Sequence, residues 1–94
     1  MNNPQENTIS PNPSLTVVIP TLNEAATLPE VIAGVRPHTD DILVVDGRSP
    51  DGTADVARSL GARVVYDHGR GKGEAIRTVI GHLERDIVVF IDAD

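Results

Sequence analysis

The chain has 94 residues, a formal net charge of −6 and no cysteine. This length suits one small domain, and the lack of cysteine excludes a disulfide framework, a thiolate metal site and a cysteine nucleophile. An acidic chain whose only aromatic residues are Tyr66 and Phe90 lacks the features of a nucleic-acid-binding protein. No apolar run is long enough for a membrane span, and none has the flanks of a signal peptide. We therefore expect a cytoplasmic protein that does not bind nucleic acid.

The first half of the chain predicts a leader, a strand and a helix. Residues 1–14 are rich in Asn and Pro and contain few apolar side chains, so we expect a flexible leader there. Residues 15–19 form a short β-branched run closed by Pro20, which is typical of a strand buried on both faces. Residues 27–30 (TLPE) match a capping box with proline in the first helical turn. Apolar residues then recur at helical spacing until Pro37 ends the helix.

The alternation of apolar strands and amphipathic helices continues to the end of the chain. Further strands are predicted at residues 42–45, 63–66 and 87–91, with helices between them. Asp51 or Thr53 can cap the second helix. The order βαβαβαβ leaves connections long enough for crossover helices, so it predicts an α/β fold with a parallel sheet and helices on both faces.

Residues of unusual chemistry follow the strands of this sheet. In parallel α/β folds, ligands bind beyond the carboxyl ends of the strands. Here these ends carry residues 20–24, 46–48, 68–73 and 92–94. The coincidence predicts a binding site at this edge of the sheet.

Four acidic residues at this edge are candidates for function. Asp92 and Asp94 can share Mg²⁺ or Mn²⁺ that bridges to substrate phosphates, or they can simply solvate a strand end. Asp46 can accept N–H donors of a base or hydroxyls of a ribose, or it can cap its own turn. Glu24 follows a strand whose next helix already has a cap in Thr27, so its carboxylate suits ribose hydroxyls.

The glycine-rich segment 69–73 does not match a known phosphate loop. Tyr66 and Gly73 stand where a Walker A loop needs Gly and Ser or Thr. Arg70 and Lys72 still lie near a predicted helix N-terminus, which suits a diphosphate. A glycine hinge with two solvated basic side chains is the alternative.

Four motifs together resemble the family 2 glycosyltransferases. They are VIPTLNE at residues 18–24, VVDGRSPDGT at 44–53, GKG at 71–73 and FIDAD at 90–94. The pattern is similar above all to the polyprenyl-phosphate sugar synthases. The resemblance implies a GT-A (Rossmann-like) fold, with residues 15–94 as its N-terminal, nucleotide-sugar-binding half.

The resemblance also implies roles for five nucleotide-binding positions. Pro20, Asn23 and Glu24 would line the base and ribose. Asp46 would contact the base, and Lys72 would lie near the nucleotide.

The remaining implied site is the metal motif. Asp92 and Asp94 would form it, with Asp94 as the direct ligand of Mg²⁺ or Mn²⁺ and Asp92 also on the nucleotide. The implied reaction is transfer of a hexose, with inversion, from a UDP-sugar or GDP-mannose to an acceptor such as a polyprenyl phosphate or a small molecule. The catalytic base would lie beyond Asp94, so no catalytic residue is expected in residues 15–94.

Two departures from the family pattern have consequences. Many members carry DDGS where this chain has DGRS at residues 46–49. The second acidic contact is missing, and Arg48 adds a cation that either touches a phosphate or lies on the surface. The chain also ends after the fourth strand, so we expect a truncated and inactive piece that self-associates through its uncovered apolar strand 87–91. Any membrane association would reside in sequence absent here.

Two other classes of protein share this predicted architecture. A regulatory or nucleotide-binding α/β module without catalysis, such as a receiver domain, needs an acidic pair after its first strand. A sugar-phosphate nucleotidyltransferase needs a glycine-rich basic loop there. Residues 20–24 are neither, and stabilisation by a nucleoside diphosphate with Mn²⁺ would favour the glycosyltransferase.

Overall fold

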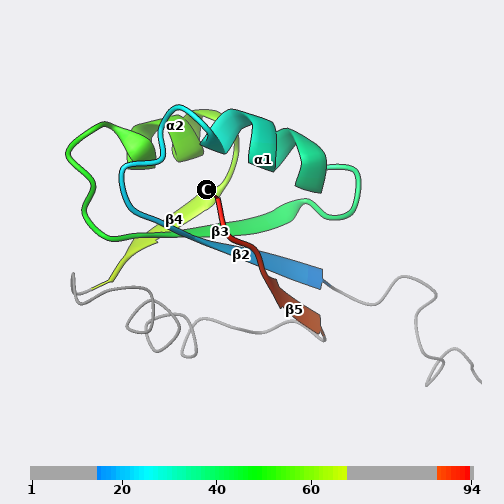
Figure 1. Cartoon of the computed structure of the whole chain (residues 1–94). Helices are drawn as coiled ribbons and strands as arrows, with labels where there is room; N and C mark the ends of the chain where they lie inside the picture. Colours follow the sequence, from blue (N-terminus) through cyan, green and yellow to red (C-terminus); the bar gives the residue numbers. More distant parts are fainter. Residues whose placement is uncertain (1–14, 68–86, 94) are drawn as a thin grey trace, which may run out of the picture.

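The computed structural model describes residues 15–67 and 87–93 (Figure 1). The leader expected at residues 1–14, the glycine-rich loop at 69–73, the third helix and Asp94 lie outside the described residues. Lys72 therefore lies outside them too.

Four parallel strands form one sheet in the order β4-β3-β2-β5. In chain order the strands are β2 (Leu15–Thr21), β3 (Asp41–Asp46), β4 (Arg63–Tyr66) and β5 (Ile87–Phe90). The register pairs Thr21 at the end of β2 with Asp46 at the end of β3. Because all four strands run in the same direction, their carboxyl ends meet at one edge of the sheet. The predicted parallel α/β fold is confirmed.

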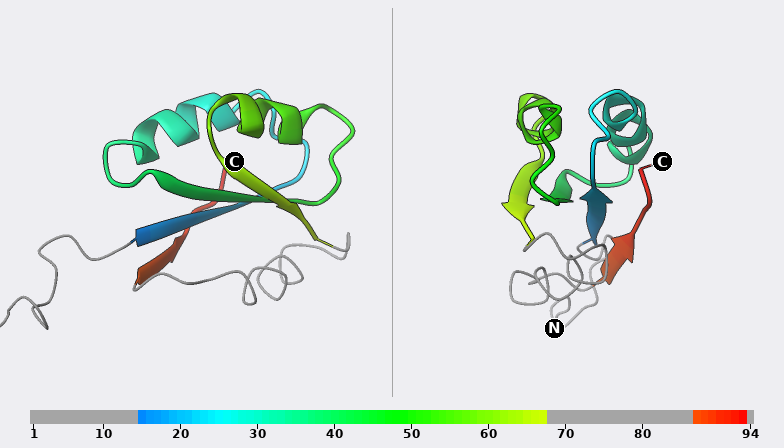
Figure 2. Two further views of the ribbon diagram at one scale, coloured as in Figure 1. Left: turned by 180° about the vertical axis from the view of Figure 1, so that it is seen from behind. Right: turned by 60° about the vertical axis from the view of Figure 1, so that its left-hand side comes forward.

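Two helices connect the first three strands. Helix α1 (Leu28–Val35) follows β2, and helix α2 (Thr53–Ser59) follows β3. Both lie over the same face of the sheet (Figures 1 and 2). For the opposite face, the prediction of helices on both faces depends on the predicted third helix. That helix lies outside the described residues, so this part of the prediction stays untested. Neither described helix is long or apolar enough to cross a membrane.

The apolar core lies on both faces of the two inner strands. Under the helices, Ile19 and Val44 pack with Leu28, and all three are fully buried. On the opposite face Val18 and Leu43 are equally inaccessible to solvent. The prediction of strands buried on both faces is therefore confirmed for β2 and β3. Full burial of each such side chain contributes about 1.5–3 kcal/mol to stability.

Two details of the predicted elements are wrong. Pro20 lies inside β2 and does not close it. The Val18 carbonyl accepts from the Ile91 amide, so the backbone groups of Val18 and, two residues later, Pro20 point toward the β5 side. The pairing of β2 with β5 ends at Val18. The missing N–H of Pro20 therefore costs no hydrogen bond of the sheet. The capping box does not form either, because Thr27 has helical φ and ψ and its Oγ1 donates to the Glu24 carbonyl at 3.4 Å.

Candidate functional site

Asp46 is a buried hydrogen-bonding centre at the carboxyl end of β3. Its side chain is fully buried. Oδ1 accepts the Thr21 hydroxyl at 2.8 Å and the Ser49 hydroxyl at 2.6 Å, while Oδ2 accepts the Ser49 amide at 2.7 Å. The carboxylate therefore serves three donors of its own chain. Contact between Asp46 and a base stays a prediction.

The loop after β2 has its backbone amides bound by side chains. We call residues 22–25 the amide loop, because each of these four consecutive amides donates to a side-chain oxygen. The acceptors, in order, are Glu24 Oε1 (3.0 Å), Ser49 Oγ (2.8 Å), Thr53 Oγ1 (3.1 Å) and Asp51 Oδ2 (3.1 Å). Since a phosphate bound at a loop needs free amides, these bonds make the amide loop unsuitable as a diphosphate cradle.

The conformation of the amide loop depends on Asn23. Its φ of 57° lies in the left-handed region, which Asn tolerates better than most residues because its short polar side chain can bond locally. Asn23 and Leu22 are exposed, whereas Pro20 is buried within the sheet. The left-handed turn allows the Leu22 amide to meet the Glu24 carboxylate two residues later.

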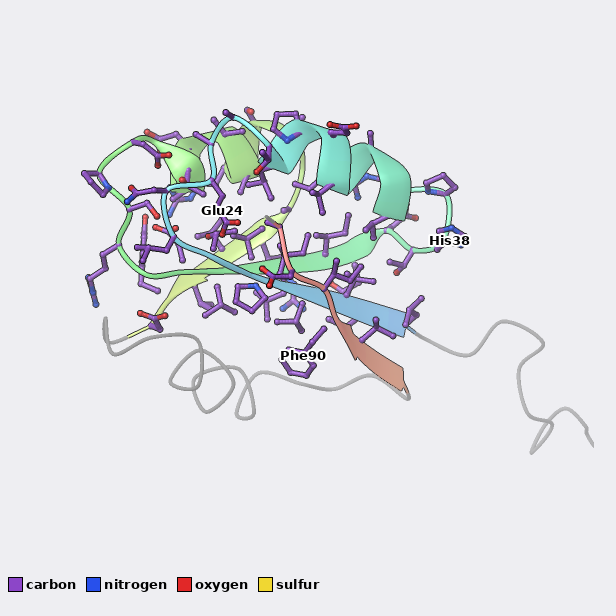
Figure 3. The ribbon with its side chains drawn as sticks, in the orientation of Figure 1. Glu24, His38 and Phe90 are labelled. Carbon is purple, nitrogen blue, oxygen red and sulfur yellow. The ribbon has the colours of Figure 1, made fainter. Side chains whose placement is uncertain are left out.

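Glu24 presents the one buried side-chain oxygen without a hydrogen-bond partner in the described part of the chain. Only 8% of the residue is exposed, Oε1 holds the Leu22 amide, and Oε2 has no partner. Figure 3 shows Glu24 near the carboxyl end of β2, on the side of the sheet covered by the helices. A buried carboxylate oxygen without a donor is costly. A ligand hydroxyl would satisfy it.

Asp51 and Thr53 form the second support of the amide loop. Thr53 is fully buried, and both its amide, at 3.0 Å, and its hydroxyl donate to Asp51 Oδ1. The hydrogen bond from the Thr53 hydroxyl is the main reason why the pKa of Asp51 lies below its usual value. Burial opposes this shift, and the amides of Ala25 and Thr53 add smaller effects that lower the pKa. Asp51 thus bonds the amide of the first residue of α2. The predicted N-cap at Asp51 or Thr53 is wrong, because the N-cap residue is Gly52.

Asp67, directly after β4, is a residue that the sequence analysis missed. Its amide donates to Asp46 O at 3.0 Å, and its side chain is buried. A Cβ placed on Gly47 would lie 3.7 Å from Asp67 Oδ1 and 3.4 Å from Leu22 Cδ1. The acidic side chain that many family members carry at this position would therefore meet Asp67. Its place at a strand end was the available signal.

Arg48 contacts the end of β4 and the residue that follows it. Its guanidinium is 5.5 Å from the centre of the Tyr66 ring, and its Nε donates to Asp67 O at 3.2 Å. Arg58 lies over the same ring at 5.7 Å, and its hydrogen bond to the Tyr66 hydroxyl raises the pKa of the guanidinium. Arg48 is exposed, and its contact with a phosphate stays a prediction.

The segment after β5 carries the described part of the predicted metal motif. Ile91 N donates to Val18 O at 2.9 Å, which holds this segment beside β2. Ala93 is buried in the core under the helices, and Asp92 is exposed. A carboxylate at this edge suits a hard cation. Asp94 lies outside the described residues, and within them no group of three potential metal ligands occurs.

The residues that match a known family span most of the chain. A family model described as glycosyl transferase family 2 matches residues 16–94. The chain belongs to glycosyl transferase family 2. Glycosyltransferase AglJ of Haloferax volcanii is 40% identical over 80 residues, which cover 83% of this chain and 26% of that protein.

Solved glycosyltransferase structures agree with this assignment. Mannosyl-3-phosphoglycerate synthase from Rubrobacter xylanophilus matches with a TM-score of 0.80 and 35% identity, over 87% of this chain and 31% of that one. Glucosyl-3-phosphoglycerate synthase from Mycobacterium tuberculosis, solved with Mn²⁺, UDP and glucosyl-3-phosphoglycerate, matches with a TM-score of 0.78 and 38% identity, over 87% of this chain and 34% of that one. The GT-A fold is confirmed. This family 2 chain spans about a third, or less, of the length of these relatives.

Proposed function

We propose that this chain is the donor-binding part of an inverting glycosyltransferase, which transfers a hexose from a UDP-sugar or GDP-mannose to a phosphorylated acceptor. The observation that carries the proposal is Glu24 Oε2, a buried oxygen without a donor at the carboxyl edge of the sheet. The hydroxyls of a nucleotide ribose are donors of the required kind. Hydrogen bonds from a neutral donor to a carboxylate are stronger than those between neutral groups.

In the proposed complex, the ribose and the diphosphate of the nucleotide lie at different places along the carboxyl edge of the sheet. Glu24 would accept a ribose hydroxyl, and Asn23 and Pro20 would lie near the base and ribose. The amide loop offers no free amide for the diphosphate, so the diphosphate would extend toward β5 and Asp92. Lys72 is proposed to lie near it.

The proposed metal site consists of Asp92 and Asp94, which would hold Mn²⁺ or Mg²⁺ through carboxylate oxygens. Such a cation would neutralise the charge that develops on the leaving diphosphate. The Mn²⁺ and UDP bound to the M. tuberculosis enzyme support this assignment.

The proposed acceptor carries a phosphate. Glucosyl-3-phosphoglycerate, bound to the M. tuberculosis enzyme, supports a phosphorylated small molecule, and a polyprenyl phosphate offers the same anionic group on a lipid. Vesicles that contain a polyprenyl phosphate, compared with soluble 3-phosphoglycerate, distinguish the two acceptors in a transfer assay of the full-length enzyme.

The proposal is tested by calorimetric titration of the 94-residue chain with UDP and with GDP, each with and without Mn²⁺. We expect one nucleotide to bind in the presence of Mn²⁺. Glu24→Gln should weaken binding about tenfold or more, because a hydrogen bond to a charged group is lost. Glu30→Gln, an exposed substitution on α1, is the matched control and should leave the affinity unchanged. Absence of binding by both nucleotides would contradict the proposal.

A further inference from the structure

We infer that Asp46 is a positioning residue: through Ser49 it fixes the amide loop, and in this way it presents Glu24 to the nucleotide ribose. This inference rests on the proposed function and deepens it. It gives Asp46 a role other than the contact with the base that the family resemblance implies.

The first step is that the carboxylate of Asp46 is committed inside the protein. It is completely buried and accepts hydrogen bonds from Thr21 and twice from Ser49. Because the residue is inaccessible to solvent, a base could reach this carboxylate only if the surrounding residues moved. Because Thr21 and Asp46 are register partners of adjacent strands, the pairing of the sheet itself holds this arrangement.

The second step is that Asp46 orients the hydroxyl of Ser49. A serine hydroxyl has one proton to donate and two lone pairs to accept with. The short bond of 2.6 Å directs the proton to Asp46 Oδ1, and a lone pair then receives the Asn23 amide at 2.8 Å. Without the carboxylate the hydroxyl would be free to rotate, and its proton could face the amide. Asp46 therefore determines whether Ser49 can accept from Asn23.

The third step connects Asn23 to Glu24. The bond from its amide holds Asn23 at the left-handed φ of 57°. This turn brings the Leu22 amide to Glu24 Oε1 at 3.0 Å, which orients the carboxylate and leaves Oε2 for a ligand. The chain of contacts therefore runs from Asp46 through Ser49 and Asn23 to Glu24.

The two roles for Asp46 differ in which part of the nucleotide they affect. A positioning role acts on the ribose contact of Glu24, so it should change the preference for ribose hydroxyls and leave base discrimination alone. A direct base contact should do the opposite. A purely structural role should lower thermal stability and change neither preference.

The experiment measures both preferences by calorimetric titration of the 94-residue chain in the presence of Mn²⁺. The ribose preference is the affinity for UDP divided by that for 2′-deoxy-UDP or 3′-deoxy-UDP. The base preference is the affinity for UDP divided by that for CDP. If the chain selects GDP, then GDP replaces UDP in both ratios, deoxy-GDP replaces deoxy-UDP, and inosine diphosphate replaces CDP. We expect a ribose preference of about tenfold or more in the wild-type chain, and Glu24→Gln should abolish it.

The decisive variants are Ser49→Ala and Asp46→Asn. Ser49→Ala should reduce the ribose preference toward that of Glu24→Gln. Asp46→Asn should reduce it less, because its amide oxygen can still accept the Ser49 hydroxyl while its NH₂ group faces the Ser49 amide. Both should leave the base preference within about twofold of wild type. Ser49→Ala keeps the test valid if Asp46→Asn fails to fold. Ser49→Thr, which retains the hydroxyl, should restore the ribose preference. Ser59→Ala is the matched control, because it removes a hydroxyl that bonds Val56 O at 2.7 Å at the far end of α2.

The outcomes separate this inference from the proposed function. A wild-type chain that binds neither nucleotide, or has no ribose preference, overturns both. A wild-type ribose preference that persists in Ser49→Ala, or a changed base preference in Asp46→Asn, overturns the positioning role alone.

Discussion

The carboxyl ends of β2 and β3 differ sharply from the β5 side of the same sheet. In the first region, Thr21, Asp46 and Thr53 are buried. The Thr21 hydroxyl donates to Asp46, and the Thr53 hydroxyl oxygen accepts the Glu24 amide. On the β5 side, Val89 and Phe90 are 40% and 43% exposed, and Phe90 lies on the face opposite the helices (Figure 3). An apolar groove of about 270 Å³ also lies between α1, β2 and β5, with Val35 and Ile91 in its wall.

This difference shows that, within the described part of the chain, only one of the two regions has a geometry fixed by many internal contacts. The end of β2 and β3 obtains its geometry from contacts between described residues, so its shape is already present before any ligand arrives. The β5 side carries exposed apolar surface close in sequence to Asp92, which is itself exposed, so this side is less enclosed among the described residues. The predictions below test this contrast, beginning with the largest expected effect.

Asp46→Ala should destabilise the chain by about 3 kcal/mol, because the Thr21 hydroxyl and both donors of Ser49 lose a charged acceptor. The measurement is urea unfolding followed by circular dichroism. Asp55→Ala is the control: Asp55 is 89% exposed and pairs with Arg58 at 3.3 Å, so its loss should cost at most about 0.5 kcal/mol. Equal effects of the two substitutions would show that the Asp46 network adds no stability.

Thr53→Val should cost about 1.5 kcal/mol, since it leaves the Glu24 amide without its acceptor in a buried position. Hydrogen exchange measured by NMR gives a local reading: the Glu24 amide should exchange faster. The Leu28 amide, which donates to Glu24 O at 3.0 Å, should not. Thr53→Ser keeps the hydroxyl and should preserve the protection of Glu24. Loss of protection in Thr53→Ser as well would argue against the hydroxyl as its source.

Much of the fold could be predicted from the sequence, because apolar periodicity marks each element locally. The strand at residues 63–66 and the start of α1 at Leu28 agree with the structure. The sequence also placed Glu24 and Asp46 at the same edge. It could not show what Asp46 binds, because Thr21 and Asp46 are 25 positions apart and meet only through the register of two strands. The predicted capping box failed because its motif does not specify the backbone angles of Thr27.

Val89→Lys should change association more than stability. Val89 is exposed on β5, at the edge of the described sheet, so its replacement should alter the unfolding free energy by about 0.5 kcal/mol or less. We expect the 94-residue chain to self-associate, and a charge on an edge strand opposes pairing with another strand. Light scattering over a range of concentrations should therefore show smaller particles for the variant. A wild-type chain that is monomeric at every concentration would refute the prediction.

The smallest expected effect is the pH dependence contributed by Asp51. The Thr53 hydroxyl lowers the pKa of Asp51 in the folded chain below the ordinary value of 3.8. A carboxyl with a depressed folded pKa stabilises the protein above its unfolded pKa, and this contribution disappears as the pH falls through the folded pKa. The thermal midpoint should therefore fall less steeply with pH in Asp51→Asn than in the wild-type chain, between about pH 5 and pH 2.5. Thr53→Val removes the hydroxyl that causes the shift, so it should reduce the slope as well. If only Asp51→Asn reduced the slope, the depressed pKa would arise from the amides of Ala25 and Thr53. The hydrogen bond between Asp51 and the Ala25 amide of the amide loop would then contribute more to the pKa than the bond to the Thr53 hydroxyl.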